Sequence, residues 1–161
     1  MLFLAMLLNW SCEDWFEVSA DNEVTKEDLL STYDGVRSAL HGIYRGVSSD
    51  ELYARHLSWG FVSILGQNYT SNSLRYSQIY VSANKYEYDH ANVEPLIAQI
   101  WEKAYNIIAN CNTLIESVEK RDSLFFPLKQ VEKDLILGEA RGIRALLHFD
   151  LLRLFAPAPV K

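Results

Sequence analysis

Apolar residues recur along this chain at alternating spacings of three and four, the pattern of a helix with one buried face. The first such run predicts a helix that opens at Thr25, whose hydroxyl can cap it together with Asp28 three residues later. Its apolar positions are Leu29, Tyr33, Val36, Leu40, Ile43 and Val47. A second pattern predicts a helix over residues 48–66. Its apolar positions are Tyr53, Leu57, Phe61 and Ile64.

Two longer helices are predicted in the second half of the chain. The first covers residues 93–120, with Pro95 in its opening turn, where a missing N–H is tolerated. Its apolar positions are Ile97, Trp101, Ala104, Ile108, Cys111, Ile115 and Val118. Cys111 is therefore expected in the core. The last helix covers residues 127–155, because two prolines that follow it prevent its continuation.

The last predicted helix carries small, apolar and polar side chains in separate stripes. Its small residues, Gly138, Gly142 and Ala145, predict a close approach by another helix backbone. The apolar side is predicted at Leu146, Phe149, Leu152 and Phe155, and a polar stripe at Arg141, Arg144 and His148. Long helix pairs with small residues at their contacts are typical of tetratricopeptide-like hairpins, although the ~34-residue consensus of those repeats is absent. The predicted fold class is all-α, with tetratricopeptide-like helical hairpins.

A polar stretch rich in tyrosine, residues 66–92, separates the second and third helices and is expected to be a long irregular loop insertion. Amides and an arginine are interleaved with its tyrosines. Sugars present an apolar C–H face beside hydroxyl edges, so a sugar site needs aromatic platforms and amide or guanidinium partners. The candidate ligand-binding residues are Tyr69, Arg75, Tyr76 and Tyr80. The alternative is that these tyrosines cover an edge of the core.

Length and charge limit the classes of protein that fit. A chain of 161 residues suggests one domain with one core. The formal net charge is -6, and the sequence holds no basic patch. Because contacts to phosphates need clustered Lys and Arg, nucleic acid is not expected as a partner.

The start of the chain is typical of an exported lipoprotein. Residues 1–8 are apolar, too few to span a bilayer but enough for the core of a signal peptide. Ser11, a small residue, then precedes Cys12. We expect residues 1–11 to be a signal-peptide remnant, Cys12 to be lipidated, 12–24 to be a tether and 25–161 the helical domain. A buried amphipathic start is the alternative, since no Lys or Arg precedes Lys26.

The sequence contains little that indicates an enzyme. Its four histidines share no metal-ligand spacing, and neither a nucleophile motif nor a phosphate-binding loop is present. Adjacent acids such as Glu27-Asp28 are better explained as helix caps than as a glycosidase pair. We therefore expect no catalytic residue, no metal site and no cofactor.

Three stretches carry a resemblance to a known family. The opening S-C-E-D-W-F-E-V of residues 11–18 resembles the lipidated start of SusD-like (RagB/SusD) nutrient-uptake lipoproteins. The W-x3-Y-x-I-I-x-N-C-N stretch of residues 101–112 and the G-E-A-R-G-I-R-A to L-L-R-L-F run of residues 138–155 are similar to two further segments of that family. Members of the family are much longer, so the chain resembles the N-terminal, incomplete part of a larger SusD-like fold.

The resemblance implies a surface-exposed lipoprotein of Bacteroidetes-type outer membranes, held by its lipid anchor. Such a protein binds an oligosaccharide or other nutrient and delivers it to a partner TonB-dependent (SusC-like) transporter, on which it acts as a lid. It is a binding protein, whose loops between helices hold the ligand. The alternative is a helical protein–protein interaction scaffold without a ligand site of its own. A polysaccharide affinity gel distinguishes the two, because a glycan-binding protein is retained on the gel and a scaffold without a ligand site is not.

Overall fold

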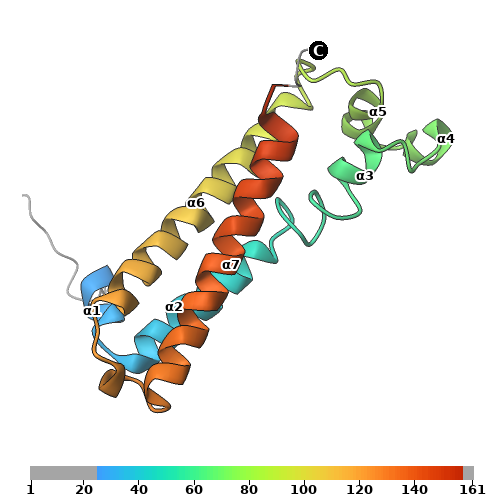
Figure 1. Cartoon of the computed structure of the whole chain (residues 1–161). Helices are drawn as coiled ribbons and strands as arrows, with labels where there is room; N and C mark the ends of the chain where they lie inside the picture. Colours follow the sequence, from blue (N-terminus) through green and yellow to red (C-terminus); the bar gives the residue numbers. More distant parts are fainter. Residues whose placement is uncertain (1–24, 158–161) are drawn as a thin grey trace, which may run out of the picture.

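The computed structural model describes residues 25–157, and within this range every regular element is a helix, as predicted. The helices are α1 (Lys26–Leu30), α2 (Tyr33–Val47), α3 (Phe61–Leu65), α4 (Ser71–Leu74), α5 (Gln78–Asn84), α6 (Glu94–Glu119), a short 3-10 helix (Ser123–Phe125) and α7 (Lys129–Phe155). Figure 1 shows α6 and α7 as a long antiparallel pair, with α1 and α2 at one end and α3, α4 and α5 to the side of the other end.

The core lies where α2, α6 and α7 meet. Each of these helices contributes side chains that are nearly inaccessible to solvent: Val36, Leu40, Ile100, Leu114, Ile136 and Leu147. Burial of such side chains is the main source of stability of a helix bundle, since isolated helices are marginal in water. The remaining helices extend this core at its two ends.

The first predicted helix is two helices, α1 and α2. Thr25 caps α1 as expected, and its hydroxyl accepts the backbone N–H of Asp28 at 3.1 Å. The break follows from Thr32, whose hydroxyl accepts the N–H of Gly35 at 3.1 Å and starts a new helix. The turn also brings Gly35 against the carbonyl of Leu29, which lies 1.6 Å from where a Cβ would stand. Only glycine fits there.

The predicted helix over residues 48–66 is wrong for most of its length, because only its last part, α3, is helical. The chain before α3 forms wide turns, in which the N–H groups of Leu57 and Gly60 bond the carbonyls of Leu52 and Arg55, five residues back. A regular helix separates residues five apart by about 140°. The wide turns instead bury Leu52 and Leu57 together, at 0% and 7% exposure.

The insertion between α3 and α6 is present, but two short helices, α4 and α5, interrupt the irregular chain. The ends of the insertion are tied together. Gln67 donates its side-chain N–H to the carbonyl of Asn84 at 2.9 Å, and the hydroxyl of Tyr86 donates to the carbonyl of Leu65 at 3.0 Å. These bonds hold α5 beside α3.

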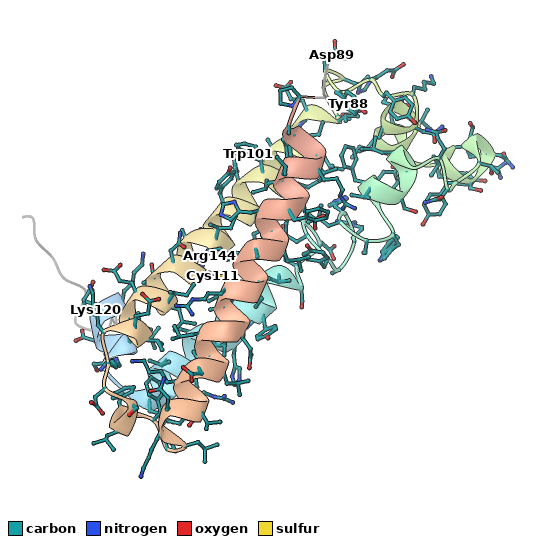
Figure 2. All side chains as sticks on the ribbon, in the orientation of Figure 1. Tyr88, Asp89, Trp101, Cys111, Lys120 and Arg144 are labelled. Atoms are coloured by element: carbon teal, nitrogen blue, oxygen red, sulfur yellow. The ribbon has the colours of Figure 1, made fainter. Side chains whose placement is uncertain are left out.

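Helix α6 confirms its prediction closely. Ala104, Ile108, Ile115 and Cys111 of the predicted stripe are buried, and burial raises the pKa of the Cys111 thiol, which keeps it protonated and unreactive. Arg144 of α7 lies near this cysteine (Figure 2) and donates to the side chain of the adjacent asparagine of α6. In the first half of α6 the buried face lies one position earlier than predicted, because Leu96 and Ile100 are buried, whereas Ile97 is half-buried and Trp101 is 42% exposed.

Helix α7 forms as predicted but is rotated. Three of its four predicted apolar positions face solvent: Leu146, Phe149 and Leu152 are 46%, 59% and 64% exposed, whereas Phe155 is half-buried against the core. The buried stripe is a different one, Ile136, Ala140, Ile143, Leu147 and Leu151. It also contains two acids, Glu132 and Asp150, both buried. Both stripes repeat at spacings of three and four, so the period alone does not distinguish them. The two acids make the buried stripe look like the polar one in the sequence.

The two buried acids are satisfied by hydrogen bonds. Glu132 accepts the hydroxyl of Tyr33 and the N–H of Leu128, and the Tyr33 bond holds the pKa of this carboxyl below its ordinary value. Asp150 accepts the hydroxyl of Tyr53 and pairs with Arg153 at 2.6 Å. Each acid thus joins α7 to a tyrosine from the first third of the chain.

The predicted close helix crossing at Gly138 and Gly142 is wrong. A Cβ at either glycine would meet nothing within 4 Å, so neither contacts another backbone. Gly142→Ala is therefore expected to raise the free energy of unfolding by about 0.5 to 1 kcal/mol, because alanine is the better helix former and no clash opposes it. Urea denaturation midpoints test this, and a destabilised variant would show that the site is packed.

Candidate ligand-binding site

A polar cleft lies between the wide turns, α5 and the start of α6. Its volume is about 350 Å³, within the usual size of small-molecule sites. Its polar lining is Arg55, His56, Ser77, Tyr80, Asn92 and Gln99. This set offers a guanidinium, an imidazole, two amides and two hydroxyls, and its lining includes no carboxylate.

Local structure holds each side of the cleft. Arg55 pairs with Asp50 at 3.0 Å across the wide turns, which fixes the guanidinium at the cleft wall. Ser77 caps α5 and faces the cleft beside Tyr80. On the third side, the opening turn of α6 supplies Pro95, whose ring adds apolar surface next to the amides.

His56 is the most unusual group of the cleft. Its side chain is 5% exposed, and its Nδ1 has no hydrogen-bond partner among the described residues. Burial, and next the guanidinium of Arg55, lower the pKa of His56 below its ordinary value, so the ring is neutral. Arg55 Nε is also buried without a partner. Unpaired buried polar groups are costly, and both of these atoms belong to residues that line the cleft.

The structure does not bring the four predicted ligand residues together. Tyr80 lines the cleft and is half-buried. Tyr69 packs against the core and donates its hydroxyl to the carbonyl of Trp59 at 2.8 Å. Arg75 and Tyr76 form a pair at the end of α4, with the guanidinium 4.6 Å from the ring centre and Tyr76 85% exposed. Of the four, Tyr80 alone belongs to the cleft.

Sequence reasoning missed Arg55 and His56, because the surrounding stretch was assigned to a regular amphipathic helix. The available signal was a histidine placed between the apolar residues Leu52 and Leu57. It also missed Asn92 and Gln99, two amides on either side of a helix start. Nothing in their spacing separates them from ordinary surface residues.

A second group of aromatic side chains lies outside the cleft, at the outer edge of α6 and α7. Trp101 packs against Tyr105 in a tilted arrangement with ring centres 4.7 Å apart, and it forms an edge-to-face contact with Phe155 at 4.9 Å. Figure 2 shows Trp101 toward the end of the molecule that carries Tyr88. Trp101 and Tyr105 are 42% and 41% exposed. Exposed rings of this kind can stack on a ligand or on a partner protein.

Cys12, the predicted lipidation site, lies outside the described residues. Between residues 25 and 157 no three His, Cys, Asp or Glu side chains gather in a way that could hold a metal ion. The helices in the same range all fall short of the length and apolarity that a membrane crossing requires.

One comparison with known proteins decides the family. The SusD-like family model, described as "starch-binding associating with outer membrane", matches residues 14–161. This chain belongs to the SusD-like family. The match spans the whole described helical structure, including the cleft and its insertion. No curated protein and no solved structure matches the chain.

Membership of the SusD-like family connects the chain with the outer membrane and with glycan binding in nutrient uptake. Members of this family are binding proteins rather than enzymes. A cleft lined by hydroxyls, amides and one guanidinium suits a polyhydroxylated ligand, because each of these groups can bond a sugar hydroxyl.

Proposed function

We propose that this SusD-like chain is part of a surface lipoprotein of the outer membrane, which binds a glycan or other nutrient and delivers it to a TonB-dependent transporter. The observation that supports this most is the cleft, whose polar lining consists of hydroxyls, amides, an imidazole and a guanidinium. These are the groups that bond sugar hydroxyls.

In the proposed complex, the ligand's hydroxyls replace water at the polar wall of the cleft. Gln99 and Asn92 have both a donor and an acceptor, so each can bond two neighbouring hydroxyls of one sugar ring. Arg55 adds a donor through its guanidinium, which lines the same wall. Tyr80 and the ring of Pro95 supply apolar surface for the C–H face.

Calorimetric titration with a maltooligosaccharide tests this site. Gln99→Ala and Tyr80→Ala are each expected to weaken binding about tenfold, or about 1.4 kcal/mol, because each leaves hydroxyls or C–H surface without a partner. The melting temperature should change little for Gln99→Ala, whereas Tyr80→Ala also removes contacts with the core and should lower it. Gln130→Ala is the matched control, since this glutamine is exposed on α7 and outside the cleft.

The same titration distinguishes the cleft from the exposed pair at α4. If Tyr76→Ala weakens binding while Tyr80→Ala and Gln99→Ala do not, the ligand sits on Arg75 and Tyr76 and the cleft is not the site. An interaction scaffold without a ligand is the second candidate function, favoured by the exposed apolar side of α7. It predicts no retention on any polysaccharide affinity gel.

Lipidation of Cys12 is expected to hold the protein on the membrane, since a cysteine after a short apolar run is the acceptor in lipoproteins and acyl chains give stable anchoring. With the natural upstream start, Cys12→Ala should move the protein from the detergent-requiring membrane fraction to the soluble fraction. A variant that stays with the membrane would assign the anchor to another residue. Cys111→Ala, which changes a buried thiol, is the control.

A further inference from the structure

An apolar groove lies between α1, α2 and α6, toward the opposite end of α6 from the cleft. Figure 1 shows these three helices together at that end of the molecule. Its volume is about 370 Å³. Leu29, Leu30, Ile43 and Leu114 form its apolar wall, and Leu29 is 39% exposed there. Gly42 leaves it open, because a Cβ at this position would meet nothing within 4 Å. The groove is thus large enough for bulky side chains and has none in it from the described residues.

We propose that this groove binds the chain's own segment ahead of α1, residues 13–18, with Trp15 and Phe16 as the side chains that enter it. This segment lies outside the described residues, and its sequence is Glu-Asp-Trp-Phe-Glu-Val. Two adjacent aromatic residues, with a valine two positions after the second, match an apolar groove of this size. Burial of such rings is strongly favourable.

The length of chain between segment and groove permits this docking. Eight residues, 17–24, lie between Phe16 and Thr25, and they span up to about 28 Å when extended. The next residue, Lys26, already lines the groove. The segment therefore needs no displacement of any helix to reach its site.

Tethering explains why the chain's own segment is the occupant. A groove of this size would hold a free peptide weakly. A short flexible connection raises the effective concentration of the tethered segment to about the millimolar range. A second copy or another protein would have to compete with this concentration from solution.

Charge adds to the match. The segment carries Glu13, Asp14 and Glu17 and no basic residue. The hollow that continues the groove along α1 and α6 is lined by three basic residues, Lys26, Lys120 and Arg121, against two acidic ones, Glu27 and Glu116. Lys26 borders both hollows. The basic excess therefore stands where the acidic segment would pass.

Docking would set how the domain stands on the membrane, a consequence that rests on the proposed lipidation of Cys12. With Trp15 held in the groove, two residues separate the lipidated cysteine from its docked neighbour. The α1 end would then lie at the membrane. The ligand cleft lies near the start of α6, and the groove lies nearer its end. The cleft would therefore lie farther from the membrane than the groove, by up to about 39 Å, the length of this 26-residue helix.

Trp15 fluorescence tests the docking directly. The chain is used with residues 1–11 removed and Cys12→Ala, and with Trp59→Phe and Trp101→Phe, so that Trp15 alone emits. We expect blue-shifted emission and weak acrylamide quenching. Gly42→Leu fills the groove and should raise the quenching constant at least about twofold. Gly142→Leu is the matched control, a helical glycine whose Cβ also meets open space, and should change nothing.

Three outcomes would overturn the proposal. Trp15 could be quenched as freely in the folded chain as in urea. It could be shielded but unaffected by Gly42→Leu, in which case it docks elsewhere. Shielding that disappears on dilution would mean that a second copy supplies the segment. Thermal melts confirm that each variant is folded, and glycan titration of the same chain shows separately whether the cleft functions.

Discussion

Replacing Leu147 with alanine is expected to lower the free energy of unfolding by about 2 to 5 kcal/mol, the usual cost of a cavity at a fully buried leucine. Leu147 is 0% exposed and lies on the buried stripe of α7. The adjacent Leu146 is the matched control, because 46% of its side chain is exposed. Leu146→Ala should change stability by less than about 0.5 kcal/mol. Urea denaturation with parallel circular dichroism measures both.

This pair also tests the rotation of α7. The sequence pattern placed Leu146 in the core, whereas the structure places Leu147 there. If Leu146→Ala were the more destabilising change, α7 would present its other side to α6. The contacts of Asp150 and Glu132 with Tyr53 and Tyr33 would then not form.

The second large effect is expected at Tyr53, whose hydroxyl donates to the buried carboxylate of Asp150. Burial of the tyrosine, and next the hydrogen bond to Asp150, raise the pKa of the Tyr53 hydroxyl, so it stays a donor at any ordinary pH. Tyr53→Phe removes this donor and leaves a buried carboxylate with one partner fewer. The expected cost is about 1 to 3 kcal/mol.

Tyr44→Phe is the control for Tyr53→Phe. Tyr44 donates to Glu139 at 2.8 Å, but both side chains are accessible to water, which can replace the lost hydroxyl. The expected loss is below about 0.5 kcal/mol. Equal losses for the two variants would show that Asp150 is hydrated in the folded state.

Two helices illustrate what the sequence could and could not predict. For α6, residues 94–119, the apolar stripe holds no charged residue, so its period identifies the buried face in the second half of the helix. For α7 the bounds were predicted nearly as well, from the prolines that follow it. The buried face of α7 was not predicted correctly, because Glu132 and Asp150 interrupt the core stripe. Their burial is tolerated only because tertiary hydrogen bonds satisfy both carboxylates.

The cleft was less predictable than the helices. Tyr80 was found because aromatic and amide residues cluster in its part of the sequence. Arg55 and His56 were not, since their place in the cleft depends on wide turns whose hydrogen bonds span five and six residues. The periods of 2 and 3.6 residues identify strands and helices, and they do not predict turns of this kind. The family resemblance, by contrast, depended on local motifs and could be read directly.

The solvent-exposed side of α7 also affects the tendency of the protein to self-associate in solution. Leu146, Phe149 and Leu152 expose apolar surface to solvent on this side of the helix. Repulsion between molecules opposes association as long as the net charge of -6 is kept. Near the isoelectric point of about 5.2 this repulsion vanishes, and excluded salts such as ammonium sulfate strengthen apolar contacts further. Neutral buffers with moderate chloride are therefore the conditions in which the helical domain stays dispersed.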